Sequence, residues 1–286
     1  MTDPKPPKRI FAEAKVDARA ATHVPSSPQT LSEAYKLAFQ DTDFLLRPDL
    51  RPVRFQLELL KPELLMNEAN IASTFVFYGS ARVPEPAKAE ALREAARSDW
   101  DKEVAERLIA KSRYYDEARK LARRVSQFPV DEDGKRHFVV CSGGGPSFME
   151  AANRGAHDVG EESIGLNIVL PHEQLPNGYV TPDLSFQFHY FALRKMHFLL
   201  RARAVAVFPG GFGTFDEMFE LLTLIQTGKV RPLPILLFGR EFWERVVNFQ
   251  ALADEGVISP HDLDLFTWCE TAEEAWDAVC RHYEVC

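Results

Sequence analysis

The sequence is 286 residues long, with a formal net charge of -8, 45% hydrophobic residues and 27% charged residues. These values are typical of a globular protein with a packed core, long enough for one large α/β domain or two small ones. The negative charge argues against general attraction to nucleic acid or to an anionic membrane surface, so an anionic ligand has to be bound locally.

The first 70 residues differ in pattern from the rest of the chain. Residues 1–30 are rich in Pro, Ala, Lys and Ser and lack an apolar period, which predicts a mobile arm. In residues 31–70 apolar side chains recur at helical intervals, which predicts a helical extension. We expect residues 71–286 to form the main domain.

Strand-like and helix-like segments alternate through this main domain. The predicted strands are 73–78, 137–141, 163–170, 204–208 and 233–238. The predicted helices are 100–128, 147–157, 190–201, 214–227, 240–253 and 272–283. Strands separated by helices indicate parallel βαβ units, hence a Rossmann-like, doubly wound, mainly parallel sheet with helices on both faces.

The cysteines and the apolar stretches bear on location. The four cysteines have no CxxC spacing and are too sparse for a disulfide framework. Residues 1–9 lack the apolar run of a secretory signal, and no stretch reaches the roughly 18 apolar residues of a membrane span. We therefore expect a cytoplasmic protein.

Small residues follow three of the predicted strands. They are Gly79, Ser80 and Arg82 after the first strand, Gly143, Gly144 and Gly145 after the second, and Gly210, Gly211, Gly213 and Thr214 after the fourth. The carboxyl ends of parallel strands lie at one edge of a sheet, so we expect the three turns to lie together there. Glycine lets the main chain approach an anion, and the free N–H groups of a following helix favour phosphate. One such turn is equally well explained by tight strand-to-helix geometry, but three at one edge favour a phosphate site.

Two familiar nucleotide-binding fingerprints are missing. The glycines after the second and fourth strands do not complete GxGxxG, and no P-loop sequence occurs in the chain. A dinucleotide dehydrogenase and a P-loop NTPase are therefore poorly supported.

The charged residues near these turns allow ordinary structural interpretations. Thr214 and Glu217 have the spacing of a capping box, and by spacing alone this interpretation is the better one. Glu220 is equally consistent with an exposed carboxylate on the same helix. Arg194 and Lys195 are adjacent cations at a helix start, which are more often solvated than catalytic.

A longer string carries a resemblance to a known family. Residues 209–217 read PGGFGTFDE and match the PGGxGTxxE signature of the LONELY GUY (LOG) family. The adjacent Arg194 and Lys195 resemble the family's RK pair, and the GGGP turn at 143–146 with Met149 and Glu150 resembles its upstream glycine turn. Together these similarities span about residues 73 to 240.

The resemblance implies a function and a set of roles. The family's members are phosphoribohydrolases, often labelled "lysine decarboxylase", that cut a nucleoside 5′-monophosphate such as AMP or a cytokinin nucleotide into free base and ribose 5-phosphate. By resemblance, Arg194 and Glu217 are the catalytic pair and the PGGxGT turn receives the 5′-phosphate. The residues of the other two turns, with Met149, Glu150, Lys195 and Glu220, are then expected to bind substrate. We also expect Arg194 to keep the Glu217 carboxylate ionised, since a nearby cation lowers its pKa.

Other implications concern cofactors and assembly. The histidines do not form a ligand cluster, and no residue pattern indicates pyridoxal phosphate, so we expect neither a metal nor a cofactor. The family forms dimers, and apolar side chains in 190–201 and 214–227 exceed what one core needs, so a homodimer or higher homo-oligomer is expected. A nucleotide-binding regulatory protein of the same fold and, more weakly, an oxidoreductase stay open as alternatives. The base and the roles of residues 1–70 and 83–128 are not determined by the sequence.

Overall fold

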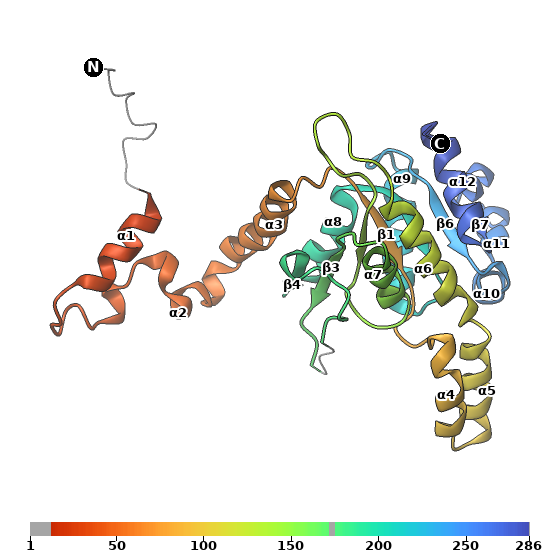
Figure 1. Cartoon of the computed structure of the whole chain (residues 1–286), viewed down its shortest axis with the longest axis horizontal. Coiled ribbons are helices and arrows are strands. Elements are labelled where there is room, and N and C mark those ends of the chain that lie inside the picture. Colours follow the sequence, from red (N-terminus) through yellow and green to blue (C-terminus); the bar gives the residue numbers. More distant parts are fainter. Residues whose placement is uncertain (1–12, 172–174, 286) are drawn as a thin grey trace. The chain divides into compact units, whose positions relative to one another are not determined.

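A computed structural model describes residues 13–171 and 175–285 of the chain (Figure 1). The chain divides into two compact units, Met1–Glu58 and Leu59–Cys286. The described part of the first unit contains α1 (Ala14–Ala20), α2 (Thr42–Leu45) and the start of α3 (Arg51–Glu68), joined by short 3-10 turns. The predicted limits at residues 30 and 70 stay predictions, and residues 1–12 of the predicted arm lie outside the described residues.

The second unit is built on a parallel sheet with strand order β4-β3-β2-β1-β5-β6-β7. The strands are β1 (Thr74–Tyr78), β2 (Val139–Ser142), β3 (Ile164–Ile168), β4 (Ser185–Phe188), β5 (Ala202–Val207), β6 (Ile235–Phe238) and β7 (Thr267–Cys269). From β1 the chain winds outward to β4, returns to form β5 on the other side of β1, and winds outward again to β7. The predicted doubly wound parallel sheet is confirmed, and its switch point lies between β1 and β5.

Helices cover both faces of the sheet, as predicted (Figure 1). Phe75 and Phe77 of β1 point into one core, with α6 (Arg113–Ser126), α7 (Phe148–Asp158) and α12 (Ala272–Tyr283). Val76 and Tyr78 point into the other, with α8 (Phe191–Leu200), α9 (Phe212–Gln226), α10 (Arg240–Val246) and α11 (Phe249–Asp254). Side chains alternate along a strand, so a β1 that is buried throughout requires a layer of helices on each side.

Several predicted elements were wrong in detail. The single helix predicted at 100–128 is two helices, α5 (Asp99–Ile109) and α6, and α5 lies beside α4 (Ala89–Ala95) in a hairpin. The apolar pattern continues across the turn at 110–112, so it does not reveal the break. The helix predicted at 240–253 likewise divides into α10 and α11. The edge strands β4 and β7 were missed, because one is only partly buried and the other has three residues.

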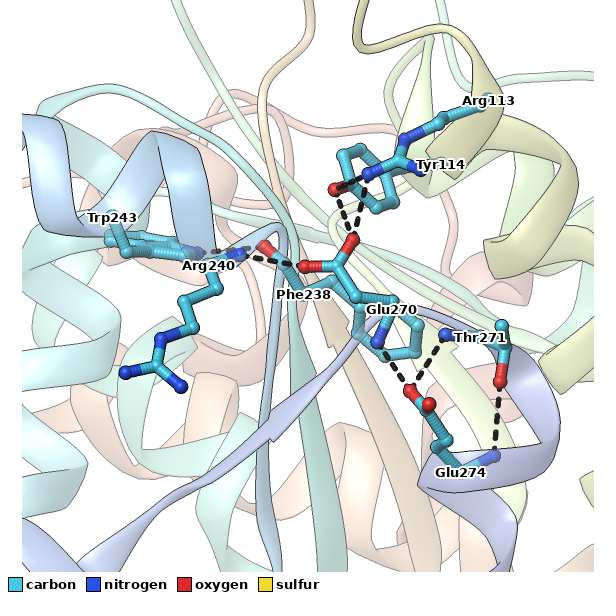
Figure 2. A network of polar contacts seen from close by, with 8 residues as sticks. All are labelled: Arg113, Tyr114, Phe238, Arg240, Trp243, Glu270, Thr271 and Glu274. Carbon is cyan, nitrogen blue, oxygen red and sulfur yellow. Dashed lines mark hydrogen bonds and ion pairs between the residues drawn. The ribbon is translucent and has the colours of Figure 1, made fainter.

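A polar network joins α6, α10 and α12 at the ends of β6 and β7 (Figure 2). Glu270 follows β7, and its carboxylate accepts hydrogen bonds from Arg113 Nη2 at 2.7 Å, Tyr114 Oη at 2.6 Å and the Arg240 N–H at 3.0 Å. Glu274 accepts from the Glu270 N–H at 2.7 Å and caps α12. We call this set the Glu270 network; it fastens α6 to the last two strands.

The cysteines of the second unit differ in their state. Cys141 and Cys269 are free and buried, whereas Cys280 is disulfide-bonded. Disulfides are rare in cytosolic proteins, so the cytoplasmic location stays a prediction.

No helix among the described residues combines the length and the apolar character that crossing a membrane requires.

Candidate active site

A cavity of about 730 Å³ opens at the carboxyl ends of β1 and β5, at the switch point of the sheet. Nine of the predicted site residues line it: Gly79, Ser80, Arg82, Met149, Arg194, Gly211, Gly213, Thr214 and Glu217. The first and third predicted turns therefore meet in one cavity, and α7, through Met149, and α8, through Arg194, form part of its wall.

One wall of the cavity is the amino-terminal end of α9. The helix begins at Phe212, with Gly211 as its cap residue, and the first N–H that bonds back is that of Phe215, to the Gly211 carbonyl at 3.0 Å. Within the described residues, the N–H groups of Phe212, Gly213 and Thr214 have no hydrogen-bond acceptor. Unpaired N–H groups and the positive end of the helix dipole together suit an anion.

Close packing explains the glycine at position 210. A Cβ there would lie 2.1 Å from Thr214 Oγ1, so no larger residue fits without moving the turn. Thr214 itself is 5% exposed and lies in the first turn of α9. Gly210 thus shapes the turn from behind and does not line the cavity.

The capping-box interpretation of Glu217 was wrong. Because α9 begins at Phe212, Thr214 lies inside the helix and no side chain caps its start. Glu217 instead faces α8, where its Oε1 lies 3.6 Å from Arg194 Nη1, and the side chains of Arg194 and Glu217 are 12% and 14% exposed. The two residues form an ion pair too long for a hydrogen bond.

The expectation that Arg194 keeps Glu217 ionised was also wrong. Burial raises the pKa of Glu217 to about 7, and Arg194, which works in the opposite direction, does not cancel this effect. Asp216 and Glu220 add to the increase through their negative charges. Near neutral pH, the carboxylate and carboxylic acid forms of Glu217 are therefore both populated.

Arg194 is held in place on three sides. Its Nε donates a hydrogen bond to the Leu166 carbonyl at 2.6 Å, and its guanidinium lies 5.1 Å from the centre of the Phe198 ring. The main chain of Gly143 lies against it, because a Cβ at Gly143 would be 2.6 Å from Arg194 Nη2. The interpretation of Arg194 as a solvated cation was therefore wrong, and its orientation is fixed before any ligand binds.

The GGGP turn is a support for Arg194 and not a wall of the cavity. Gly144 has a positive φ of 72°, and its N–H bonds to Ser142 Oγ at 3.1 Å. The side-chain amide of Asn177 donates to the carbonyl groups of Gly144 and Gly145 at 3.1 and 3.0 Å. These bonds fix the turn, and through Gly143 they fix the space that Arg194 occupies.

Three further predicted residues lie outside the cavity lining. Glu150 accepts a hydrogen bond from Tyr115 Oη at 3.1 Å. Lys195 and Glu220 pair with each other, Nζ to Oε2 at 3.2 Å. Their predicted contact with substrate stays a prediction.

Sequence reasoning missed some of the lining. Phe212 and Phe215 lie inside the motif but had no predicted role, and Val246 comes from the end of α10. Phe212 is 97% exposed. The motif itself points to the two phenylalanines, whereas no sequence signal connects Val246 with this site.

A second hollow of about 770 Å³ lies on the other side of α8 and α9. Its lining is mainly apolar and includes Met196, Leu200 and Leu224, with Arg203 and Arg231 beside them. Glu220 also belongs to its lining. The hollow is slightly larger than the first cavity, but its lining contains neither the glycine turns nor the Arg194–Glu217 pair, so we place the chemistry in the first. Among the described residues, no group of three His, Cys, Asp or Glu side chains could hold a metal ion.

The fold and the first cavity define a doubly wound α/β protein whose cavity at the switch point is a candidate anion site. Residues 149–279 match the family model described as "Possible lysine decarboxylase". A cytokinin riboside 5′-monophosphate phosphoribohydrolase of Arabidopsis thaliana, LOG2, is 26% identical over 153 residues, 52% of this chain and 67% of that protein. A pyrimidine/purine nucleotide 5′-monophosphate nucleosidase of Escherichia coli K12 is 29% identical over 133 residues, 41% of this chain and 27% of that protein.

Among solved structures, a molybdenum cofactor carrier protein of Chlamydomonas reinhardtii aligns with 74% of this chain and 99% of its own at 17% identity, with a TM-score of 0.44. The family model and the sequence relatives confirm the resemblance to the LONELY GUY family that the motifs predicted.

Proposed function

We propose that this protein hydrolyses the N-glycosidic bond of a nucleoside 5′-monophosphate, which releases the free base and ribose 5-phosphate. The observation that carries the proposal is that Arg194 and Glu217 line the same cavity as the unpaired N–H groups of α9. The relatives named above support it, because they act on nucleoside 5′-monophosphates according to their names.

A nucleoside 5′-monophosphate can be arranged along the cavity with its phosphate at α9 and its ribose at Glu217. The 5′-phosphate would lie at the N–H groups of Phe212, Gly213 and Thr214, with the dipole of α9 behind it. Glu217 lies on the same helix, about one turn further on, so a ribose bound beside the phosphate would have its anomeric carbon near this carboxylate. Arg82 and Ser80 of the turn after β1 also line the cavity and would provide further polar contacts.

Glu217 would act as the ionised carboxylate. As the base departs, the ribose acquires oxocarbenium character, and a negative charge beside the sugar stabilises that developing positive charge while it orients a water or a ribose hydroxyl. Arg194 holds the carboxylate toward the cavity from α8. Because neighbouring groups fix the guanidinium, little reorganisation is needed in the transition state.

A product assay tests this proposal. The full chain is incubated with AMP, GMP, CMP and a cytokinin riboside monophosphate, with the matching nucleosides as controls, and free base is measured by chromatography. We expect base release from at least one monophosphate and from none of the nucleosides, because the α9 site requires the phosphate. Tight binding of a nucleotide that stays intact for hours would contradict hydrolysis and favour the regulatory alternative.

We further propose that two copies of the chain assemble into a homodimer through α8 and α9. Phe191 and Met196 of α8 are 55% and 45% exposed, and Met196 belongs to the lining of the second, mainly apolar hollow. Light scattering at two protein concentrations tests this: a mass of one chain at both would contradict it.

A further inference from the structure

Neighbouring cations on α8 point to opposite sides of the α8–α9 contact. Arg194 lines the cavity together with Glu217, whereas Lys195 does not. Lys195 Nζ lies 2.9 Å from Asp216 Oδ1 and 3.2 Å from Glu220 Oε2. Its side chain is only 18% exposed, whereas those of Asp216 and Glu220 are 58% and 36% exposed.

The charges at this contact are unbalanced. Asp216, Glu217 and Glu220 place three carboxylates within five residues of α9, and α8 opposes them with two cations, Arg194 and Lys195. Two further titratable groups interact with Glu217 from the sheet. They are Tyr78 of β1 and Cys141 of β2, and because burial raises the pKa of each, both are uncharged near neutral pH.

We propose that Lys195 is a positioning residue for Glu217: it pairs with Asp216 and Glu220, offsets part of their negative charge beside the Glu217 carboxylate, and does not contact the substrate. This proposal rests on the proposed function and gives Lys195 a role distinct from that of the adjacent Arg194. The pairing of Lys195 with both carboxylates, and its position outside the cavity lining, are the observations that support it.

The proposal predicts the direction in which each neighbouring charge moves the pKa of Glu217. Burial alone would lower the pKa of Lys195, but its hydrogen bonds to Asp216 and Glu220 raise it, so the ammonium group stays charged. Lys195 lowers the pKa of Glu217, whereas Asp216 and Glu220 raise it. Loss of Lys195 should therefore make Glu217 harder to ionise, and loss of Asp216 should make it easier.

Titration of Glu217 in the full-length protein tests the proposal without any need for turnover. The carboxyl carbons of glutamate are labelled with ¹³C, and the Glu217 signal is assigned by its loss in Glu217→Gln. We expect Lys195→Met to raise the pKa of Glu217 by roughly 0.5 to 1 unit, Asp216→Asn to lower it, and the double variant to lie close to wild type. Lys195→Arg, which keeps the charge, should titrate like wild type.

The opposite changes expected for the pKa of Glu217 in Lys195→Met and Asp216→Asn distinguish an electrostatic role of Lys195 from a purely structural link between α8 and α9. Lys195→Met and Asp216→Asn break the same bond, so a purely structural role would move the pKa of Glu217 in one direction in both variants, or in neither, and would overturn the proposal. If Lys195→Met fails to fold, Asp216→Asn and Lys195→Arg still give the expected decrease and the expected lack of change.

Kinetics distinguish positioning from substrate binding. In Lys195→Met the pH dependence of kcat/KM should shift to higher pH, with KM for the nucleotide near wild type above pH 8. A KM raised tenfold or more at every pH, with no shift of the profile, would show that Lys195 binds the substrate and would contradict the proposal. If the wild-type protein releases no base, the proposed function fails, whereas the titration still decides the role of Lys195.

Discussion

Two glutamates follow strands of the same sheet, and their surroundings differ sharply. Glu270 comes after β7, is 41% exposed and accepts hydrogen bonds from Arg113, Tyr114 and the Arg240 N–H (Figure 2). Glu217 lies in the helix after β5, is 14% exposed, and among the described residues has only the Arg194 ion pair at 3.6 Å on the cavity side. The first carboxylate is satisfied by the protein, and the second is not.

This difference indicates where the chemistry lies. The carboxylate of Glu270 accepts hydrogen bonds from groups on neighbouring helices. These bonds connect three helices, so the carboxylate contributes to stability. Glu217 is buried without such donors, and burial raises its pKa to about 7. A carboxylate left in this state costs stability, which is typical of functional sites.

Removing the charge of Glu217 should affect activity far more than removing that of Glu270, and this is the largest effect we expect. Glu217→Gln should lower kcat for base release roughly 100- to 1,000-fold, because one preorganised charge that stabilises the transition state is lost. Glu270→Gln is the matched control and should retain a kcat near wild type. Equal losses in the two variants would mean that the contrast between the two sites has no functional meaning.

The variants Glu217→Gln and Glu270→Gln should also change stability in opposite directions, and the change in Glu217→Gln should depend on pH. The folded-state pKa of Glu217, about 7, lies above its ordinary 4.5, so the folded protein holds this proton more tightly and its stability falls as the pH rises from about 4.5 through 7. Gln stays neutral, so Glu217→Gln should gain about 2 to 3 kcal/mol relative to wild type between pH 5 and pH 8.

Urea unfolding at the two pH values measures this gain. Glu270→Gln serves as the control and should be less stable than wild type by about 1 to 2 kcal/mol at both values, because donors of the Glu270 network lose a charged acceptor. A Glu217→Gln variant that is less stable than wild type at pH 8 would refute the explanation by burial.

Substitutions at two glycines after β5 should affect stability and substrate binding separately, and these effects should be smaller than those of the glutamate variants. Gly210→Ala should cost about 1 to 3 kcal/mol of stability, since its Cβ would lie 2.1 Å from Thr214 Oγ1. A Cβ at Gly213 meets nothing within 4 Å, so Gly213→Ala should fold at least as stably as wild type. Gly213 lines the cavity at the α9 N–H groups, however, so we expect the added methyl group to crowd a bound phosphate and raise KM for the nucleotide about tenfold. An unchanged KM would place the phosphate elsewhere.

Much of the fold could be predicted, because buried parallel strands produce short apolar runs such as 74–78 and 235–238 separated by helix-length segments. The edges of the sheet could not. The strand β4 alternates buried and exposed residues, and β7 has three residues, so neither produces such a run. The break between α5 and α6 was also hidden, since apolar residues on both sides of it keep a helical spacing.

The candidate site was predictable in its residues but not in its physical state. The motif indicated Arg194 and Glu217, yet spacing alone favoured a capping box formed by Thr214 and Glu217. That interpretation requires the helix to begin after Thr214, whereas α9 begins at Phe212, and this start depends on how the chain leaves β5. The pKa of Glu217 depends on burial between α8 and α9 as well as on the adjacent Arg194. Burial of this kind is a property of tertiary packing, and no sequence spacing expresses it.

The pH dependence of kcat/KM for hydrolysis of a nucleoside monophosphate by the wild-type protein tests the central claim most directly. Because the account requires an ionised Glu217, activity should rise with pH through an inflection near 7, and this inflection should be absent from the residual activity of Glu217→Gln. An activity that falls as the pH rises through 7, or an inflection that persists in Glu217→Gln, would contradict the assignment of Glu217 as the functional carboxylate.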